Sequence, residues 1–376
     1  MTAVNNALVI GGGFSGMAAA LRMRRAGIAV DLVEIDPQWC PLGAGITVNG
    51  PTLRALESLG LYGDFVREGF VSNGADCFTA DGKPLTHLAT PKVHGSDVSG
   101  GGGIMRPVLA RIMAQATRQA GVDVRLGCSY TTLRQDKDAV TVGFTDGSER
   151  RYDLVVGADG VHSRLRGELF PEVTPPGYIG QGVWRAVLPR PPELDAPRMW
   201  FGVHIKVGVN PVSNDLMYMF ITEDRPTKEH IDPSTWPDVV IGLLQPFTDP
   251  FVQALIPHLR QPEAAIDYRP LGNLLVPTPW NRGRVVLIGD TVAATTPHLA
   301  SGAGIGIESG IVLGEELERH SDLQAALDAF HARRFPRCQL VIGSSERLCR
   351  IEIEGGDKAE HARVMRDAMT ALAEPI

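Results

Sequence analysis

The stretch ALVIGGGFSGMAAALRMRRAGIAVDLVEID, residues 7–36, decides the fold class of this chain. Residues 7–10 form a short apolar run that predicts a buried strand, and residues 17–27 predict a helix that ends at Gly27. A second apolar run, residues 28–36, predicts a second strand. Both strands are almost entirely apolar, which is typical of a parallel sheet covered by helices on both faces. The sequence therefore begins as an α/β fold.

The turn between the first strand and the helix carries the spacing G-x-G-x-x-G, at Gly11, Gly13 and Gly16. Gly11 permits a tight turn, Gly13 lets the backbone approach a pyrophosphate, and Gly16 allows close packing of helix on strand. The helix N-terminus offers free N–H groups and the positive end of its dipole to phosphates. Glu34, near the end of the second strand, could accept a hydrogen bond from a ribose hydroxyl. We expect a dinucleotide cofactor; a glycine turn in an unrelated α/β fold is the alternative.

The composition is that of an ordinary globular protein. Of 376 residues, 44% are hydrophobic and 21% are charged, which excludes a disordered, collagen-like or fibrous chain. No uncharged apolar run approaches the roughly 18 residues that a membrane span needs, and no basic region precedes the first apolar stretch. The net charge of −7 and the absence of a long basic run argue against nucleic-acid binding. Five widely spaced cysteines without C-x-x-C indicate no structural zinc site and predict a reducing cytoplasmic location.

The rest of the chain leaves the α/β pattern and returns to it. Residues 74–93 predict a hairpin, and the alternation over 178–221 predicts an antiparallel sheet. The run SGGGG, 99–103, predicts a flexible connection before a helix over 106–120. Helices are expected to dominate after residue 302.

Two later segments indicate which dinucleotide is bound. DLVVGADGVHSRLR, 153–166, contains D-G-x-x-S-x-x-R beginning at Asp159. VLIGDTVAATTPHLASGAGIGIES, 286–309, places Asp290 at the end of a strand, followed by Pro297 and a glycine-rich helix start. Together with the N-terminal glycines, these motifs resemble the single-component FAD-dependent aromatic hydroxylases, the group A flavoprotein monooxygenases. The three motifs occur in the right order, and the resemblance covers almost the whole chain.

The resemblance implies an α/β fold with an FAD-binding Rossmann-like (GR2-type) domain, an inserted antiparallel β-sheet substrate domain and C-terminal helices. A homodimer is common among such proteins. The FAD-binding domain is expected to comprise residues 1–72, 100–175 and 275–350, the β-rich substrate domain residues 73–99 and 176–274, and the C-terminal helix residues 351–376.

The resemblance also assigns residues to FAD. Asp290 matches the aspartate that binds the ribityl chain, and Arg106 matches an arginine that contacts the flavin. Gly302, Gly304 and Gly306 would let the helix start approach the isoalloxazine ring, where its amides stabilise negative charge. The residues expected to bind FAD are Gly11, Gly13, Phe14, Ser15, Gly16, Glu34, Arg106, Asp159, Asp290, Gly302, Ala303 and Gly304.

Several motif positions leave alternatives open. Ser163 and Arg166 match a fingerprint linked to both FAD and the nicotinamide cofactor, or they serve only the fold. Ala293 stands where the family commonly has a histidine, so no imidazole acts there. Ser309 stands where an acid often follows the residue matched by Glu308. Neither departure threatens flavin binding.

The resemblance implies that oxygen is transferred from a flavin C4a-hydroperoxide to an electron-rich ring, and that the protein excludes water from this intermediate. The substrate residues are therefore expected on the β-rich sheet that faces the flavin. Residues 204–220 are similar to a segment of urate-hydroxylase-like members in which a basic residue and a tyrosine lie twelve positions apart, here Lys206 and Tyr218. The chain as a whole is comparably similar to salicylate-hydroxylase-like members. Lysine cannot make the bidentate contact that arginine makes, so the sequence does not decide whether the substrate resembles urate. The residues expected to act on the substrate are Tyr218, His298, Lys206, His204, Arg185 and Pro297.

The predicted function is an FAD-dependent monooxygenase that uses NADPH or NADH and O2 to hydroxylate a small aromatic or N-heteroaromatic substrate. The nicotinamide cofactor would bind transiently, because the sequence contains no second G-x-G-x-x-G unit. One alternative is an FAD-dependent oxidase or dehydrogenase of the same fold that inserts no oxygen. Another is a flavin or ligand sensor, which would not consume NADPH.

Overall fold

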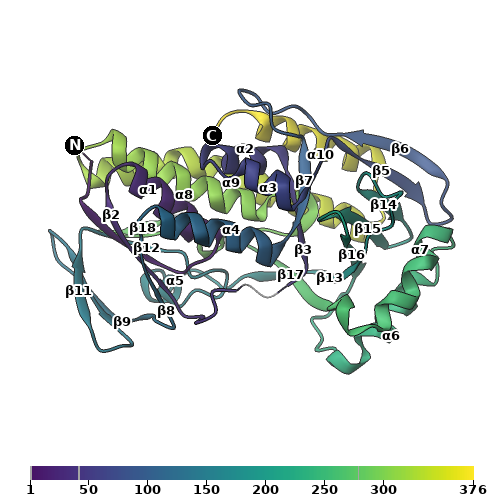
Figure 1. Cartoon of the computed structure of the whole chain (residues 1–376), viewed down its shortest axis with the longest axis horizontal. Helices are drawn as coiled ribbons and strands as arrows, with labels where there is room; N and C mark the ends of the chain where they lie inside the picture. Colours follow the sequence, from purple (N-terminus) through teal and green to yellow (C-terminus); the bar gives the residue numbers. More distant parts are fainter. Residues whose placement is uncertain (1, 41–42, 278) are drawn as a thin grey trace.

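The computed structural model describes residues 2–40, 43–277 and 279–376. Figure 1 shows an elongated molecule with the N-terminal α/β part at one end and a large sheet with two short helices at the other. No helix within the described ranges is both long and apolar enough to cross a membrane. The helices are α1 (Phe14–Arg25), α2 (Gly50–Ser58), α3 (Tyr62–Glu68), α4 (Arg106–Gln119), α5 (Arg164–Leu169), α6 (Trp236–Leu244), α7 (Pro250–Leu255), α8 (Gly302–Arg319), α9 (Leu323–Glu354) and α10 (Lys358–Ala373).

A six-stranded sheet forms the α/β part, in the order β18-β19-β12-β1-β2-β8. All neighbours pair in parallel except β18 and β19, which confirms the expected parallel sheet. Its strands are β1 (Asn6–Ile10), β2 (Ala29–Glu34), β8 (Asp123–Leu126), β12 (Leu154–Gly157), β18 (Asn281–Arg282) and β19 (Val285–Leu287). A small antiparallel sheet accompanies it: β9 (Tyr130–Gln135), β10 (Val140–Phe144) and β11 (Glu149–Tyr152).

Helix α8 packs along α1 at very short range because glycines recur every four residues on one of its faces. A Cβ atom at Gly310 would lie 2.5 Å from the backbone nitrogen of Ala19, and one at Gly314 would lie 2.6 Å from the Arg22 side chain. This packing brings two chain segments almost 300 residues apart into one layer and places the first turn of α8 beside the glycine turn.

The glycine run at 99–103 is not a flexible connection, so that prediction is wrong. Strand β7 (Gly101–Met105) is the buried middle strand of an antiparallel sheet with β3 (Gly45–Asn49) and β4 (Phe70–Ser72). A Cβ atom at Gly102 would lie 2.5 Å from the Phe70 carbonyl oxygen, and one at Gly103 would lie 2.3 Å from the Pro211 carbonyl oxygen. These glycines permit the close approach of backbone, the other common reason for glycine in a strand.

The eight-stranded sheet has the order β20-β17-β13-β16-β15-β14-β5-β6. It contains both the hairpin and the antiparallel strands expected from the sequence: β5 (Gly74–Thr79), β6 (Pro84–Ala89), β13 (Gly177–Pro189), β14 (Arg198–Phe201), β15 (Ile205–Pro211), β16 (Leu216–Asp224), β17 (Asp267–Leu275) and β20 (Ala293–Ala294). Met217 and Met219 pack into a core with α6 and α7, whereas Tyr218 belongs to a separate small cluster on the opposite face.

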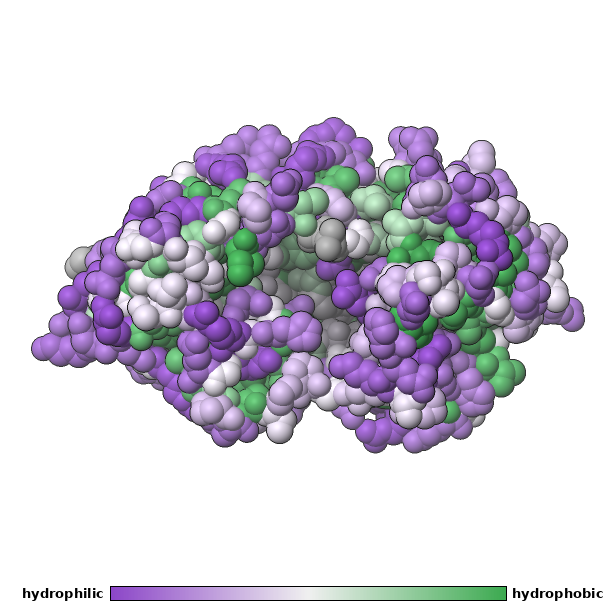
Figure 2. Space-filling view, turned by 90° about the horizontal axis from the view of Figure 1, so that it is seen from below, coloured by the Kyte–Doolittle hydropathy of each residue, from purple (hydrophilic) through white to green (hydrophobic). Residues whose placement is uncertain are grey.

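The surface is hollowed between the two parts, with the six-stranded sheet on the left and the eight-stranded sheet on the right (Figure 2). The C-terminal helices span this division, since α9 contacts α8, β13 and β17. The expected helix over 351–376 is divided: α9 continues to Glu354, Gly355 adopts a left-handed conformation, and α10 begins at Lys358.

Candidate functional site

The glycine turn after β1 is tight at Gly11 and closely packed at Gly16, as expected, and it is open at Gly13. Gly11 has φ +107°, and a Cβ atom there would lie 2.3 Å from the Ala158 carbonyl oxygen. A Cβ atom at Gly16 would lie 2.0 Å from the Gly11 carbonyl oxygen, so the helix needs glycine there. A Cβ atom at Gly13 would have no atom within 4 Å. The turn is therefore closely packed at two glycines and open at the third.

The open side lies at the N-terminus of α1. Gly13 is the N-cap residue and no side chain caps this helix start, so its first amides remain available to an anion. Glu34 lies beside the turn at the end of β2, where its Oε2 accepts a 2.6 Å hydrogen bond from the Gly12 amide. The Trp39 indole donates to the Gly12 carbonyl oxygen at 2.8 Å. A helix dipole for phosphates and a carboxylate for a ribose thus stand side by side.

Asp290 lies in the short 3-10 turn after β19, and its side chain is exposed to solvent. Nearby protein atoms still desolvate the carboxyl in part, which raises its pKa to about 6, against the opposing effect of Arg106. The next residue, Thr291, holds the turn to the D-G-x-x-S-x-x-R segment: its hydroxyl accepts from the Gly160 amide at 3.0 Å. This carboxylate therefore stands at the surface on a turn held by its neighbours.

Ser163 and Arg166 make contacts within the fold. The Ser163 hydroxyl caps α5 by accepting from the Arg166 amide at 2.8 Å. The buried Arg166 guanidinium donates to the Thr291 and Val161 carbonyl oxygens, both at 2.9 Å. Asp159 accepts from the Leu165 amide at 3.2 Å. These contacts agree with the alternative that Ser163 and Arg166 serve only the fold.

The glycines at the start of α8 have a reason that is independent of a cofactor. A Cβ atom at Gly304 would lie 2.2 Å from the Thr52 hydroxyl, and one at Gly306 would lie 3.4 Å from the Ser15 hydroxyl. Gly302 and Ala303 are only partly buried and begin the helix, and no side chain caps it. Helix packing thus explains glycine at 304, whereas a Cβ atom at 306 would make only ordinary contact. The open amides lie at 302 and 303.

A second group of side chains lies where β3 and β7, the strand before α4, meet the eight-stranded sheet. Tyr218 is buried, and burial raises the pKa of its hydroxyl while Arg185 and Arg106 beside it lower that pKa. The Arg185 Nη1 lies 3.8 Å from the Asp267 Oδ2, and its buried Nε makes no hydrogen bond within the described ranges. Arg106 lies near the glycine turn, with its Cζ 6.0 Å from the centre of the Phe14 ring. Two guanidinium groups therefore converge on one buried tyrosine hydroxyl.

Apolar side chains surround this tyrosine. The Tyr218 and Phe220 ring centres are 6.0 Å apart. The buried members of the cluster are Ala44, Val187, Val212 and Tyr218, and Met105, Leu216 and Phe220 pack against them. A positively charged group next to an apolar surface is an arrangement that binds a flat ring with a negative charge.

Lys206 and His204 lie farther along the strands than expected. Asn210 is the residue opposite Tyr218, so Lys206 lies four residues away, roughly 13 Å at the usual rise of a strand. Its Nζ forms a 2.7 Å ion pair with Glu352. His204, at φ +55° in the turn before β15, is half exposed and contacts Asp224 at 2.8 Å. The structure does not bring these two residues to Tyr218. The partner of Tyr218 across the hairpin is eight positions away in the chain, so residues twelve and fourteen positions away lie farther along the neighbouring strand.

His298 is buried rather than open to the hollow. Only 1% of its side chain is exposed, its Nδ1 lies 2.9 Å from the Thr296 hydroxyl, and its Nε2 lies 3.1 Å from Gln181 Oε1. Pro297, by contrast, is exposed. Gln181 and Glu352, the partners that the sequence analysis missed, carry no motif and lie far from residue 298 in the chain.

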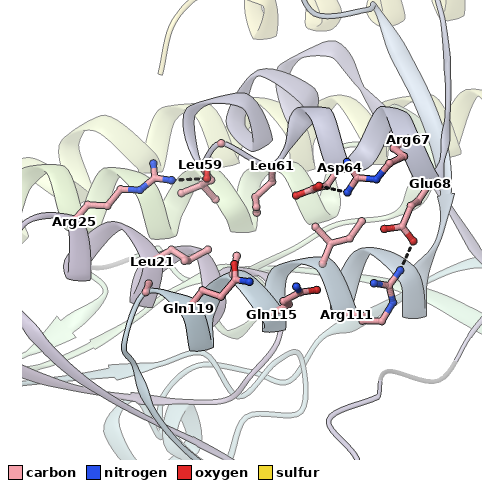
Figure 3. Close-up of a pocket in the computed structure, with 14 residues that line it drawn as sticks. Leu21, Arg25, Leu59, Leu61, Asp64, Arg67, Glu68, Arg111, Gln115 and Gln119 are labelled. Carbon is pink, nitrogen blue, oxygen red and sulfur yellow. Dashed lines mark hydrogen bonds and ion pairs between the residues drawn. The ribbon is translucent and has the colours of Figure 1, made fainter.

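The cavity of about 420 Å³ drawn in Figure 3 contains none of these residues. It lies between α3 and α4. Two ion pairs line it, Arg67 with Asp64 and Arg111 with Glu68, and Arg25 donates to backbone carbonyl oxygens. We therefore place the candidate site at the glycine turn, Asp290 and the group around Tyr218, and not in this cavity.

The comparison with known proteins agrees with this geometry. Residues 5–345 match the family model described as "FAD binding domain". This chain belongs to that FAD-binding family. It is 30% identical over 355 residues to YetM of Bacillus subtilis, named as a candidate FAD-dependent monooxygenase, with 94% of this chain and 95% of that protein covered. It is 30% identical to 6-hydroxynicotinate 3-monooxygenase of Bordetella bronchiseptica over 354 residues, covering 89% and 88%.

A solved structure extends the likeness to the fold. Klebsiella pneumoniae HpxO, complexed with FAD and uric acid, has a TM-score of 0.83 and 25% sequence identity, with 98% of this chain and 92% of that chain covered. The protein is thus an FAD-dependent monooxygenase of the hydroxylase type. Its residues fit the cofactor: the open side of Gly13 and the uncapped start of α1 suit a pyrophosphate, and Glu34 suits a ribose. The individual FAD contacts that we inferred from the sequence remain predictions.

Replacing Asp290 with asparagine in this monooxygenase is expected to stabilise the FAD-free protein. The pKa of about 6 lies above the ordinary 3.8, so ionisation of Asp290 opposes folding as the pH rises from about 4 to about 6. Asparagine removes that effect, so the gain in Tm should be near zero at pH 4 and largest above pH 6. FAD affinity should fall by roughly 10-fold or more, because a charge-assisted hydrogen bond is lost.

Thermal unfolding of apoprotein between pH 4 and 7.5 and titration by flavin fluorescence quenching check both parts. The exposed Asp97, replaced by asparagine, is the control. Equal Tm differences at every pH would show that Asp290 is not desolvated.

Proposed function

We propose that this monooxygenase uses NADPH or NADH and O2 to hydroxylate a small aromatic or N-heteroaromatic ring that carries a negative charge. The observation that carries the proposal is the convergence of Arg106 and Arg185 on Tyr218, with a buried Arg185 Nε that lacks a partner in the described part of the chain. A buried guanidinium N–H without a partner is costly, and an anionic ligand would satisfy it.

The balance of the reaction is ring–H + O2 + NAD(P)H + H⁺ giving ring–OH + H2O + NAD(P)⁺. Bound FAD would accept the hydride of the nicotinamide and pass the electrons on to O2. The residues of this chain would bind and orient the ring. Arg185 and Arg106 would pair with its negative charge, Tyr218 would exchange a hydrogen bond with its polar group, and the cluster around Phe220 would exclude water.

The names of the relatives support this substrate class. Urate and 6-hydroxynicotinate are both N-heteroaromatic acids, and they are the substrates named for hydroxylases that are 28% and 30% identical to this chain. Because Lys206 is paired with Glu352, the positive charge facing the ring would come from Arg185 and Arg106.

The test is anaerobic reduction of the bound flavin by NADPH and by NADH, with urate, 6-hydroxynicotinate, salicylate and the neutral ring 2-hydroxypyridine as additives. We expect an anionic ring to accelerate reduction at least several-fold and to give a hydroxylated product on admission of O2. Acceleration by the neutral ring alone would contradict the charge requirement. Flavin that neither nicotinamide reduces under any condition would instead favour the oxidase or dehydrogenase function.

Replacing Tyr218 with phenylalanine is expected to uncouple the reaction. The variant loses one hydrogen bond to a charged ligand, worth about 1.5–3 kcal/mol, so kcat/KM for the accepted ring should fall roughly 10- to 100-fold. More of the NADPH consumed should then appear as H2O2. Product and H2O2 per NADPH provide the measurement, and Tyr268→Phe is the matched control because the Tyr268 hydroxyl is buried without a hydrogen bond in the described structure. Unchanged coupling in Tyr218→Phe would exclude this residue from the site.

A further inference from the structure

Glu352, on α9, is the centre of a mostly buried polar cluster formed by Glu352, Lys206, His298, His361 and Gln181. Its Oε1 accepts from Lys206 Nζ at 2.7 Å and from His361 Nε2 at 3.1 Å. Its Oε2 lies 3.5 Å from both His298 Nε2 and Gln181 Nε2. One carboxylate therefore contacts groups from the substrate sheet, the last helix and the loop before α8.

The charges in the Glu352 cluster depend on one another. Burial raises the pKa of Glu352, but Lys206, His298 and His361 outweigh burial and hold that pKa well below its usual range. Only 13% of the Lys206 side chain and 1% of the His298 side chain are exposed, so neither has solvent as a substitute partner. Burial lowers the pKa of His298, while Glu352 raises it and Lys206 and His361 lower it further. Without Glu352 the cluster would retain a largely desolvated ammonium group.

Gln181 determines the proton arrangement on His298. Its Oε1 accepts from the Cys349 thiol at 3.2 Å and lies 3.1 Å from His298 Nε2, while its Nε2 donates to Asp224 at 3.1 Å. His298 Nε2 must therefore carry a proton, and Nδ1 accepts from the Thr296 hydroxyl at 2.9 Å. Both ring nitrogens are engaged, which fixes the orientation of the imidazole.

The loop that carries His298 is strained. Ala300 has φ +49°, a left-handed conformation that a non-glycine residue rarely adopts unless its surroundings hold it. The loop leads directly into the start of α8, the helix start predicted to approach the flavin. Gln181 precedes Arg185 on the same strand, β13. The cluster thus lies between the loop on the cofactor side and the strand that carries the proposed substrate arginine.

We infer that Glu352 is a positioning residue, which acts through Gln181 and His298 to hold the loop Pro297–Leu299 against β13 and so sets the flavin and the substrate strand relative to each other. Its effect on coupling rests on the proposed function, whereas its effect on the environment of the bound flavin does not. The sequence contains no signal for this role, because Glu352 belongs to no motif.

The experiment compares the FAD-loaded wild type with Glu352→Gln, Glu352→Asp and the control Glu354→Gln, which alters an exposed carboxylate two residues away. The readouts are the FAD-to-protein ratio, the visible circular dichroism of the bound flavin, Tm, and H2O2 per NADPH. We expect Glu352→Gln to keep its FAD within about twofold, to change the flavin dichroism and to raise H2O2 per NADPH at least threefold. Glu352→Asp should recover at least half of the dichroic change, and Glu354→Gln should match the wild type.

A second variant keeps the inference falsifiable if Glu352→Gln does not fold. His298→Asn leaves the ion pair of Glu352 with Lys206 intact and should reproduce the dichroic change; in the double variant the two changes should not add. A lowered Tm with unchanged flavin dichroism in Glu352→Gln and His298→Asn would reduce the cluster to an ordinary ion pair and overturn the inference. If the dichroism changes but the wild type hydroxylates none of the rings, the proposed function fails and the positioning role stands.

Discussion

Replacing Gly13 with valine is expected to yield a folded protein that binds FAD at least about 100-fold more weakly, a loss of about 2.8 kcal/mol. Gly13 has φ −71° and ψ 178°, an extended conformation that valine adopts readily. A Cβ atom there would meet no other atom within 4 Å, so the substitution introduces no clash at Cβ, and the fold pays only for a poorer N-cap residue. It would instead occupy the space at the start of α1 in which the pyrophosphate is expected, and it would shield the free amides.

The measurements for Gly13→Val are FAD content after purification, FAD titration of the apoprotein and Tm without FAD. Gly167 is the matched control, because it is exposed and a Cβ atom there also meets nothing within 4 Å; Gly167→Val should keep its FAD. Gly16→Val should differ from both by lowering the Tm of the apoprotein, since its Cβ would lie 2.0 Å from a carbonyl oxygen. Full FAD occupancy in Gly13→Val would place the pyrophosphate elsewhere.

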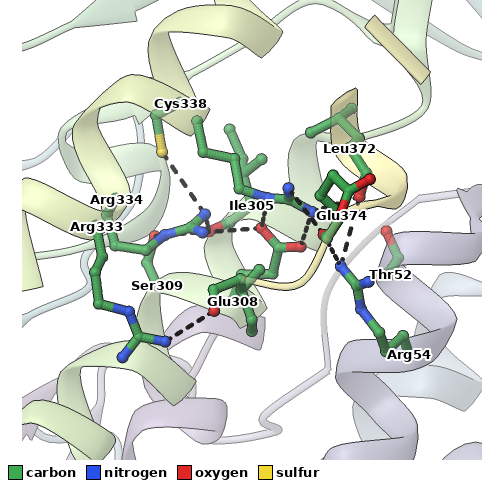
Figure 4. A network of polar contacts seen from close by, with 12 residues as sticks. Thr52, Arg54, Ile305, Glu308, Ser309, Arg333, Arg334, Cys338, Leu372 and Glu374 are labelled. Atoms are coloured by element: carbon green, nitrogen blue, oxygen red, sulfur yellow. Dashed lines mark hydrogen bonds and ion pairs between the residues drawn. The ribbon is translucent and has the colours of Figure 1, made fainter. Parts of the chain in front are cut away.

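The second large effect is expected for Glu308→Gln, which should lower the free energy of unfolding by about 3–5 kcal/mol. Figure 4 shows Glu308 of α8 in contact with arginines of α9. Its carboxylate lies 3.0 Å from Arg334 Nη1 and 2.8 Å from both Arg337 Nε and Nη2. Glu308 is 3% exposed and Arg334 is fully buried at the side chain, so loss of the anion leaves a guanidinium charge without compensation.

The same ion cluster anchors the C-terminus. Arg337 Nη2 also donates to the Leu372 carbonyl oxygen at 2.7 Å, and Arg54 of α2 donates to the Ala373 carbonyl oxygen at 2.8 Å. We therefore expect Glu308→Gln to increase proteolytic cleavage in the last helix in addition to lowering the urea midpoint. The exposed pair of Arg134 with Glu149 provides a control: Glu149→Gln should cost less than about 1 kcal/mol.

The effect of Glu308→Gln should depend on pH. Burial raises the pKa of Glu308, but Arg334 and Arg337 outweigh burial and hold it below its ordinary 4.5. An acid with a lowered pKa contributes stability above its unfolded pKa and loses that contribution as the pH falls through its folded pKa. The difference between wild type and variant should thus be constant above pH 5 and should shrink below pH 4. A difference that persists unchanged under strong acid, or a cost below 1 kcal/mol at pH 7, would contradict the role of the buried charge.

Some features of the protein could be predicted from the sequence because they depend on neighbouring residues. The positive φ at Gly11 follows from the tight turn. The placement of Tyr218 on the face opposite Met217 and Met219 follows from the alternation of side chains in a strand. The resemblance carried by three motifs implied the FAD cofactor, and the family match confirms it.

Other features led to a wrong prediction because glycine has two uses: it makes a segment flexible, or it allows another part of the chain to approach closely. Four glycines in a row favour flexibility in isolation, yet residues 101–103 form a buried strand, since backbone from β4 and from Pro211 approaches too closely for a Cβ atom. In the same way, Gly304 is required by α2, whatever a cofactor requires, because a Cβ atom there would lie 2.2 Å from the Thr52 hydroxyl. The sequence shows that a position has no side chain but not which neighbour requires its absence.

The sequence by itself determined the α/β opening, the glycine turn, the alternating faces of the substrate strands and the family, because each depends on local geometry or on a motif of contiguous residues. Only the tertiary structure decided which charged groups meet. Lys206 lies 146 residues from Glu352 in the chain, and Arg106 and Arg185 reach Tyr218 from different elements. The energy of an ion pair depends on distance and burial in space, and neither can be read from separation along the chain.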